Sequence, residues 1–314
     1  MSRSPGASVG GQAVIEGVMM RAPDAWAVAA RRPDGVIEAR RHDLPALSSR
    51  NDLAKVPFVR GIFVLIESLT LGFKALSWSA EKAGQEEEKV TRREIILTMV
   101  IALVAALGIF VLGPAFAANW IKGLVGGNAL FFVIIDGALR IALIVGYIWV
   151  IGRNPDIQRV FQYHGAEHKT IHAYENGDPL DTVAIQKYSP RHPRCGTSFI
   201  IIVAMVSFVL FLFLAPLPFG IQIAARILLI PVIAWISYEV LRAAAGTRWL
   251  AWASKPGMWI QSITTKEPDD AQVAVAVVSL LTALNHDAID EVKARGPIVP
   301  AALTAEIDLG EDDG

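Results

Sequence analysis

Four long apolar stretches constrain the fold of this chain more than any other feature of its sequence. They occupy residues 95–116, 129–151, 198–216 and 220–241 of a 314-residue chain that is 53% hydrophobic. A helix of about 20 apolar residues crosses the hydrocarbon core of a bilayer, and each stretch is close to that length. The sequence therefore predicts a mainly α protein, a polytopic membrane helical bundle with four transmembrane helices.

Basic residues in the connections predict how these helices are oriented, because loops on the cytoplasmic side of a membrane carry an excess of Lys and Arg. The segment before the first span contains Lys82, Lys89, Arg92 and Arg93. The connection between the second and third spans contains Arg153, Arg159, Lys169, Lys187, Arg191 and Arg194. The segment after the fourth span contains Arg242, Arg248, Lys255 and Lys266. The first-to-second connection contains only Lys122. All three basic segments fall on one side in a four-span arrangement, so both termini are predicted to be cytoplasmic.

A fifth apolar stretch, residues 58–78, differs from the other four. Arg60, Glu67 and Lys74 recur every seven residues and place one polar stripe on an otherwise apolar helix. Both flanks are basic, which disfavours a crossing. We expect an amphipathic helix that lies in the cytoplasmic interface or is re-entrant. A fifth span is the alternative, and it would move the N-terminus to the other side.

The two ends of the chain predict smaller elements. AWAVAAR (25–31) and GVIEARR (35–41) flank the turn sequence RPDG and indicate a small β-hairpin. PDDAQVAVAVVSLLTALN (268–285) is typical of an Asp-capped helix, here in a cytoplasmic tail. The acidic end, AEIDLGEDDG, is expected to be disordered.

These features divide the chain into six consecutive segments. They are an N-terminal cytoplasmic segment with the β-hairpin (1–50), the interfacial helix and a basic linker (51–94), transmembrane helices 1 and 2 (95–151), a cytoplasmic connection (152–197), transmembrane helices 3 and 4 (198–241), and a cytoplasmic segment with a Trp-rich interface, a helix and an acidic tail (242–314). In the last segment Trp249, Trp252 and Trp259 suit a membrane interface, where indole rings anchor.

The cytoplasmic connection contains a dense cluster of histidines and glutamates. His164, Glu167 and His168 form the pattern H-x-x-E-H, in which two histidines one helical turn apart lie on one face and can bind one zinc ion. The glutamate between them is placed to act as a general base toward water. His172 and Glu175 continue the same stripe, so His168, His172 and Glu175 form an alternative ligand set.

A second candidate group lies in HPRCGTSF, just before the third span, and consists of His192 and Cys195. Two residues separate them, a spacing at which an imidazole and a thiolate can share a metal ion. With His164 and His168 they would form a nitrogen–sulfur site suited to zinc, and three protein ligands would leave a position for water or substrate. Cys195 is the only cysteine, so no intramolecular disulfide forms.

Each of these residues also has an ordinary interpretation. A run of histidines beside a membrane can be a solvated interfacial face, and a cysteine next to an apolar helix is often an inert small residue. Gly165, inside the pattern, weakens the prediction of a helix. The joint pattern of four histidines, two glutamates and a cysteine in one connection nevertheless favours a metal or catalytic site.

Charged residues inside the spans are further candidates. Glu239, at the cytoplasmic end of the fourth span, is either an additional ligand or base, or a carboxylate that faces lipid headgroups. Asp136 and Arg140 lie one turn apart in the second span, and Arg226 lies in the fourth. Charges at that depth are costly unless paired, so an ion pair of Asp136 with one of the arginines is favoured over a polar conduit.

The order of these blocks resembles one known family. GGQAVIEGVMMRAP (10–23), VRGIFVLIESLTLGFKAL (59–76), YHGAEHKTIHAYENG (163–177), HPRCGTSF (192–199) and SYEVLR (237–242) are similar to successive signature blocks of the YqhQ-like bacterial membrane proteins. The resemblance implies a multi-pass protein of the bacterial inner membrane, in a family of unknown function described as predicted metal-dependent enzymes.

The resemblance also bears on individual residues. His164, Glu167, His168, His192 and Cys195 match the blocks behind the metal assignment. The first block adds Glu16, flanked by glycines that suggest tight turns. The Glu16 carboxylate either approaches the site or is hydrogen-bonded within a turn.

Two functions from different classes fit these observations. The first is a zinc-dependent membrane hydrolase with a cytoplasmic-face site, in which Glu167 is the base, His164 and His168 are ligands, and Cys195 or His192 completes the site; another divalent metal is the alternative to zinc. The second is a non-enzymatic scaffold, biogenesis or interaction protein with a closed structural metal site. A metal-free thiol enzyme of Cys195 and a histidine, and a transporter, are weaker alternatives.

The expected partners follow from the same features. The lipid bilayer is the first, and other membrane proteins or a peptide substrate are candidates. A net charge of −1 gives no indication of nucleic-acid binding, so none is expected. No oligomeric state follows from the sequence.

Overall fold

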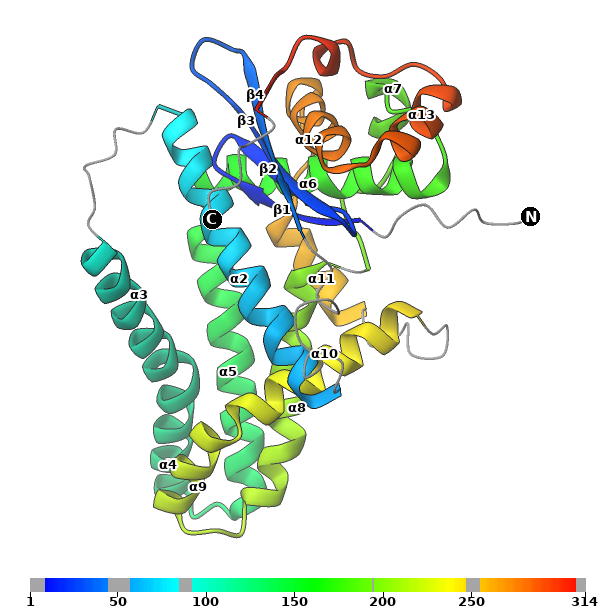
Figure 1. Ribbon diagram of the computed structural model, residues 1–314. Helices are drawn as coiled ribbons and strands as arrows, with labels where there is room; N and C mark the ends of the chain where they lie inside the picture. The colour runs from blue at the N-terminus through cyan, green and yellow to red at the C-terminus, as the bar shows by residue number, and fades with distance from the viewer. Residues whose placement is uncertain (1–8, 45–56, 85–91, 194, 247–254, 309–314) are drawn as a thin grey trace. The chain divides into compact units, whose positions relative to one another are not determined.

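The computed structural model describes residues 9–44, 57–84, 92–193, 195–246 and 255–308 (Figure 1). The chain divides into two compact units. The sheet unit combines Met1–Glu86, Gly152–Cys195 and Gln261–Gly314, and the helical unit combines Glu87–Ile151 and Gly196–Ile260. Segments from both ends and the middle of the chain therefore fold together in the sheet unit.

The sheet unit contains a five-stranded sheet in the order β1-β2-β3-β4-β5. Its strands are β1 (Gly10–Val14), β2 (Gly17–Arg21), β3 (Ala25–Arg31), β4 (Ile37–Asp43) and β5 (Glu306–Asp308). The predicted hairpin is present as the antiparallel pair β3–β4. The sheet is larger than predicted, since β1 and β2 form a second hairpin and β5 pairs in parallel with β4. The prediction of disorder is wrong for residues 306–308, which are held by this strand pairing.

Helices cover both faces of this sheet because its side chains alternate between two apolar surfaces (Figure 1). On one face, Val18 and Met20 of β2 pack in a core with α6 (Pro155–Asn176) and α12 (Asp270–Ala283). On the other face, Met19 packs with α2 (Pro57–Lys82), through Leu71 and Ala75. The shorter elements of the unit are α7 (Thr182–Gln186), α13 (His286–Arg295) and the 3-10 turn Pro300–Leu303.

The predicted Asp-capped helix is α12, and it lies at the centre of the sheet unit. The Asp269 carboxylate accepts from the Gln272 backbone N–H, and the Gln272 side-chain oxygen accepts from the Asp269 N–H, which is a capping box. Eleven of its fourteen residues are buried. A helix that is apolar on all sides belongs inside a core.

The amphipathic helix predicted at 58–78 is α2, which is longer at both ends. Glu67 of the polar stripe pairs with Arg21 of β2 at 2.7 Å, so part of this stripe is used for contact with the sheet. Phe63, Ile66, Leu69, Phe73 and Leu76 remain exposed along the helix. Its position at a membrane interface stays a prediction.

The helical unit consists of apolar helices. They are α3 (Arg92–Leu107), a π-helical turn (Gly108–Leu112), α4 (Gly113–Val125), α5 (Ala129–Ile151), α8 (Gly196–Leu214), α9 (Phe219–Leu228) and α10 (Ile230–Gly246). A further helix, α11 (Lys255–Thr264), runs from this unit into the sheet unit. Of the predicted interface tryptophans, Trp259 lies in α11, whereas Trp249 and Trp252 lie outside the described residues.

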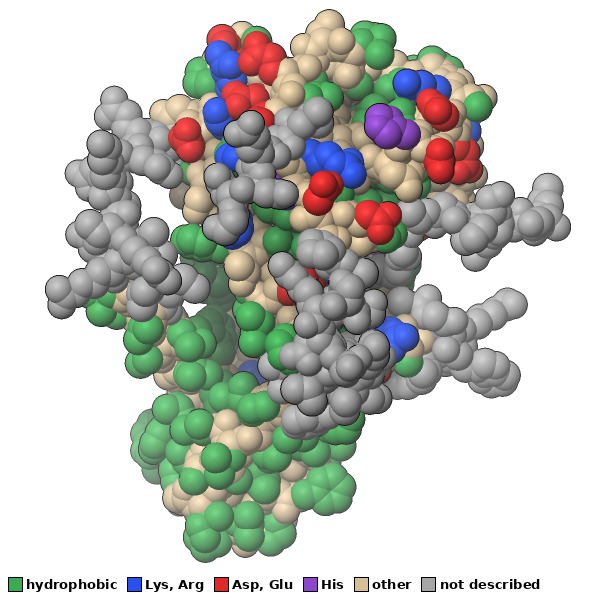
Figure 2. Space-filling view, in the orientation of Figure 1, with side chains coloured by type: hydrophobic (Ala, Val, Ile, Leu, Met, Phe, Trp, Pro, Cys, Tyr) green, Lys and Arg blue, Asp and Glu red, His purple; other side chains and the backbone are tan. Residues whose placement is uncertain are grey.

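Three described helical segments are long and apolar enough to cross a membrane: Val100–Val125, Ala129–Ile151 and Gly196–Leu214. The predicted fourth span is the pair α9 and α10, bent by 55°. The first segment ends later than predicted, since Lys122 lies in the last turn of α4 and not in a connection. Large apolar side chains such as Phe213 and Leu228 are 76% and 77% exposed, and the face of this unit in Figure 2 is mostly apolar, as expected for a surface covered by lipid.

Both ion pairs considered for the buried charges of the helical unit form together. The Asp136 carboxylate accepts from Arg226 at 2.9 Å and from Arg140 at 3.4 Å. The guanidinium groups of Arg140 and Arg226 also lie over the ring of Phe211, at 5.0 Å and 4.3 Å from its centroid. This cluster links α5 to α8 and α9, which fits the packing interpretation.

Candidate metal site

Helix α6 carries the histidine cluster, and both its ends are defined by local sequence. The Asn154 side chain accepts from the Asp156 N–H, Pro155 occupies the first helical turn, and Gly177 ends the helix in a left-handed conformation. The helix continues through Gly165, and a glycine stands at this position because it lies against the backbone of Lys266. A Cβ there would lie 2.0 Å from the Lys266 carbonyl oxygen, so only glycine fits against this segment.

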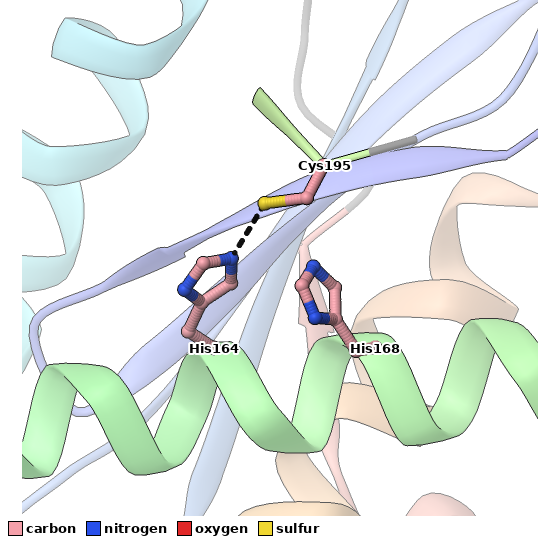
Figure 3. A group of neighbouring side chains, drawn as sticks. All are labelled: His164, His168 and Cys195. Atoms are coloured by element: carbon pink, nitrogen blue, oxygen red, sulfur yellow. Dashed lines mark hydrogen bonds between the residues drawn. The ribbon is translucent and has the colours of Figure 1, made fainter. Parts of the chain in front are cut away.

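Three ligand-type side chains converge beside α6 (Figure 3). One ligand atom from each of His164, His168 and Cys195 lies within 4.8 Å of the other two. His164 Nε2 and Cys195 Sγ are 3.1 Å apart. In a tetrahedral zinc site with Zn–N near 2.05 Å and Zn–S near 2.3 Å, such atoms would be about 3.6 Å apart, so small side-chain shifts suffice to bind one ion. The two sequence segments that carry these residues therefore meet in space.

Backbone carbonyl groups fix the orientation of both imidazoles. His164 Nδ1 donates to the Thr264 carbonyl at 2.9 Å, and His168 Nδ1 donates to the Pro190 carbonyl at 2.6 Å. A carbonyl can only accept, so each Nδ1 carries a proton, and the neutral form of each ring then has its lone pair at Nε2. Metal-binding histidines have this arrangement, in which the second ring nitrogen donates to a carbonyl or carboxylate. Burial also lowers the pKa of His168, which keeps its ring neutral and able to bind a cation.

The Cys195 segment is held by a polar contact with α11. The Gln261 side chain accepts from the His192 N–H at 2.8 Å and donates to the His192 carbonyl at 2.9 Å. The Cys195 N–H donates to the same carbonyl at 3.4 Å, so a short turn separates these two residues. This turn places the Cys195 thiol, which is 7% exposed, over the histidine face of α6.

Glu167 lies next to the ligand triad and is poorly satisfied. Glu167 is 4% exposed, and its Oε2 atom has no hydrogen-bond partner. Burial raises the pKa of Glu167 to about 8; His164 opposes this shift and Cys195 adds to it. Its carboxyl carbon would be 3.1 Å from a Cβ at Gly11 of β1. A buried carboxyl group with an unused oxygen is costly, so this is a place where a water molecule or a cation would be stabilised.

The remaining predicted ligands lie outside the triad: His172 and Glu175 near the end of α6, and His192 in the segment before Cys195. His192 is buried, and its Nε2 is 3.6 Å from a Glu175 carboxylate oxygen. The ring of His192 lies 4.5 Å from that of His172 and 5.6 Å from that of His168, between centroids. His172 Nε2 donates to the Arg191 carbonyl at 2.9 Å. The alternative set of His168, His172 and Glu175 is thus not brought together as one group in the described part of the chain.

His192 makes stability depend on pH. Burial lowers its pKa from 6.5 to about 4, although the Glu175 carboxylate at 3.6 Å would favour the charged ring. The unfolded state therefore binds more protons between these two values, and stability is lost as the pH falls from 6.5 toward 4. We expect His192→Gln to reduce the loss of unfolding free energy between pH 7 and pH 5 by up to about 2 kcal/mol. Chemical denaturation of both proteins at the two pH values measures this difference, and equal pH dependence would contradict it.

Two other candidate carboxylates have structural partners. Glu16 lies in the β1–β2 turn with a φ of 51°, and its carboxylate pairs with Arg159 and accepts from the Tyr163 hydroxyl at 3.2 Å. This matches the interpretation as a hydrogen-bonded turn carboxylate. Glu239 belongs to the helical unit, where its carboxylate lies 3.9 Å from Arg242.

Some residues that shape the site carry no signal in the sequence. Pro190 and Thr264 contribute carbonyl groups, which every residue type has, and Gln261 acts through a contact 69 positions away from His192. Gly11 had a signal, since it lies in a glycine pair of the first block, but its contact with Glu167 depends on the sheet.

Comparison with known proteins shows the family to which this chain belongs. The family described as "Protein of unknown function (DUF1385)" matches residues 56–286, and the chain belongs to this family. A protein of Bacillus subtilis (strain 168), described as "Uncharacterized protein YqhQ", is 36% identical over 303 residues, which cover 90% of this chain and 94% of that protein. The resemblance to YqhQ-like proteins is therefore confirmed. No solved structure matches the chain.

Proposed function

We propose that the protein is a zinc-dependent hydrolase of the bacterial inner membrane, with His164, His168 and Cys195 as metal ligands and Glu167 as general base. The observation that supports this proposal most is the buried Glu167 carboxyl group, which has one oxygen without a hydrogen-bond partner and lies beside three convergent ligand atoms. Two imidazole nitrogens and one thiolate form a donor set that favours zinc. Three protein ligands leave a fourth position open, as in catalytic zinc sites.

The residues have distinct roles in this proposal. His164 and His168 present their Nε2 atoms because carbonyl groups occupy their Nδ1 protons. A zinc ion at the site would supply Lewis acidity toward water and toward the scissile carbonyl group. Glu167 would take a proton from that water and return it to the leaving group. Because burial keeps the metal-free carboxyl group protonated at neutral pH, this base requires positive charge close to it, which links its action to metal binding.

The membrane setting completes the proposal. The apolar helices of the helical unit would span the bilayer, and the basic connections would place both termini and the site on the cytoplasmic side. The lipid bilayer is then the first partner, and substrates would come from the membrane or its cytoplasmic surface.

A closed structural site is the second candidate, and the burial of the cluster favours it. His168 is 1% exposed and Glu167 is 4% exposed. In this alternative the Glu167 carboxylate is the fourth ligand, and the protein is a non-enzymatic scaffold or biogenesis factor. Structural zinc sites are closed by four protein ligands.

Glu167→Gln in the cobalt-substituted protein separates the two candidates without a known substrate. If Glu167 is the base, the wild-type site has an open position, and thiocyanate changes the visible absorption of bound cobalt. The variant then loses at most the roughly 10–100-fold in metal affinity that is typical of a residue outside the ligand set. Glu175→Gln is the matched control, because this glutamate lies on the same helix but outside the triad.

The opposite result would support the closed site. In that case thiocyanate leaves the wild-type cobalt spectrum unchanged, and Glu167→Gln both weakens metal binding and makes the spectrum sensitive to thiocyanate. A metal-free thiol enzyme, the weaker alternative based on Cys195, predicts no stoichiometric metal in either protein.

A further inference from the structure

Strand β1 forms one edge of the sheet, and half of its backbone groups point outward. Among the described residues β1 pairs only with β2. Val14 and Gly17 close a two-residue turn, so they form a hydrogen-bonded pair. Hydrogen-bonded and non-hydrogen-bonded pairs alternate along an antiparallel ladder. The N–H and C=O groups of Gly11 and Ala13 therefore point away from β2, toward the open edge.

Among the described residues, β1 itself carries none of the usual edge protection. Natural proteins shield exposed edge strands with charged side chains, proline or bulges, because a free edge pairs with other chains. The sequence of β1 is GGQAV, which contains neither a charged residue nor proline. Gly10 and Gly11 are exposed, and a Cβ at Gly10 would touch nothing within 4 Å. An approaching backbone would meet little side-chain obstruction.

The same edge lies beside the candidate catalytic carboxyl group. A Cβ at Gly11 would lie 3.1 Å from the Glu167 carboxyl carbon, and β1 packs against α6. Successive helix residues are about 100° apart around the axis. Tyr163 is buried in the core under the sheet. Measured as rotation about the axis of α6 from Tyr163, Glu167 lies at about 40°, His164 at about 100° and His168 at about 140°. β1 therefore lies near the side of α6 that carries the base, and Figure 3 shows His164 and His168 beside Cys195 on that helix. A segment added beyond β1 would lie next to this strand.

We propose that β1 binds an extended polypeptide by strand addition, so that the substrate of the hydrolase is an unfolded or extended peptide segment. The outward groups of Gly11 and Ala13 would pair with alternate residues of the peptide main chain, and the scissile bond would be held near Glu167. Strand addition selects its ligand through main-chain N–H and C=O groups, which identifies polypeptide as the ligand class. This inference rests on the proposed function, since it names the substrate of the same site.

The test compares two ligands with the same metal-binding group on the purified, zinc-loaded full-length protein in detergent. The ligands are acetohydroxamate and a tripeptide hydroxamate of β-forming residues. We expect the peptide to bind about 10- to 100-fold more tightly, as two to four extra hydrogen bonds would give. N-methylation of the peptide backbone, which removes its strand-pairing N–H groups, should abolish the gain. Competition with a fluorescent hydroxamate gives all three affinities.

Ala13→Pro tests the protein side of the same contact. The Ala13 N–H points away from β2, so proline at this position removes a donor from the open edge and leaves the hydrogen bonds between β1 and β2. Ala13→Gly keeps that donor. We expect Ala13→Pro to lose the peptide gain and to keep its zinc and its acetohydroxamate affinity, and Ala13→Gly to behave like wild type. If Ala13→Pro does not fold, the N-methylated peptide on the wild-type protein decides.

Two results would overturn the inference in distinguishable ways. Equal affinity for the two hydroxamates on a zinc-loaded protein contradicts strand addition and leaves the proposed hydrolase standing. Absence of both zinc and hydroxamate binding removes the proposed function, and the inference with it. A dimer that Ala13→Pro converts to a monomer, with no change in peptide affinity, would mean that the edge pairs with a second copy of the chain.

Discussion

We expect the Cys195→Ala variant to bind almost no metal. The purified wild type should contain close to one zinc ion per chain, and the variant roughly a tenth of that or less, because removal of one of three ligands weakens binding by more than the 10–100-fold typical of supporting residues. His168→Ala should have the same effect. Elemental analysis by mass spectrometry of protein purified without chelators measures both.

The controls for this result come from the same chain. His286→Ala removes an exposed histidine of α13 and should leave the zinc content unchanged. Zinc binding should also raise the melting temperature of the wild type, since a ligand at a thousandfold excess over its dissociation constant stabilises the folded state by about 4 kcal/mol. Cys195→Ala should lose that increase. Full zinc content in Cys195→Ala would mean that the cysteine is an inert apolar residue and that the triad is not the site.

Gly165→Ala is expected to destabilise the sheet unit even though alanine favours helix formation. Its Cβ would lie 2.0 Å from the Lys266 carbonyl oxygen, which is backbone and cannot turn aside. The Lys266 N–H donates to the Phe161 carbonyl at 2.9 Å, so the segment is also fixed to α6 by a hydrogen bond. Overpacking of this kind costs about 3 kcal/mol, against a gain of about 1 kcal/mol in helix propensity. A fall in melting temperature, followed by intrinsic tryptophan fluorescence, measures the balance.

Gly146→Ala is the matched control because it is also inside a helix. A Cβ at Gly146 of α5 would meet nothing within 4 Å, so propensity alone should act, and stability should stay equal or rise. Opposite signs for the two substitutions would locate the effect in the contact with Lys266. We also expect Gly165→Ala to weaken zinc binding, since it moves the helix turn that carries His164. A stable Gly165→Ala protein would contradict the close approach of these two segments.

The sequence predicted the long helices well and placed the two histidines of the triad on one helix face, because these signals are local. Apolar length located the four candidate spans, and the i, i+4 spacing placed His164 and His168 on one face. The break between α9 and α10 was not predicted from apolar length, although Pro231, two residues after Leu229 where the helices part, is a signal for an interrupted helix.

The sheet and the role of α12 were harder to predict because they depend on contacts distant in sequence. The strands β1 and β2 are short and rich in glycine, and their turn, Ile15–Glu16, lacks the usual turn residues. The sequence predicts an Asp-capped helix in a cytoplasmic tail at 268–285, although a short helix that is apolar on all sides indicates a buried position. The helix is buried because it packs on the five-stranded sheet, of which the local sequence pattern predicted only one hairpin.

Three of the predicted site residues, His164, His168 and Cys195, lie together, but their arrangement did not follow from the sequence. Spacing alone left His192 and Cys195 as equivalent partners for the α6 histidines. The structure distinguishes them, because the Gln261 contact and the turn before α8 direct Cys195 toward His164, while His192 lies near Glu175. Gly165 weakened the prediction of a helix, and the reason for it, the Lys266 carbonyl, comes from a segment about 100 residues away.

X-ray absorption at the zinc edge of the purified wild-type protein tests the central claim most directly, since it reads the ligands of the metal itself. A site of His164, His168 and Cys195 predicts one sulfur at about 2.3 Å and nitrogen or oxygen ligands at about 2.0–2.1 Å, two of them imidazoles. A zinc environment without sulfur, or with sulfur but no imidazole scattering, would contradict the triad.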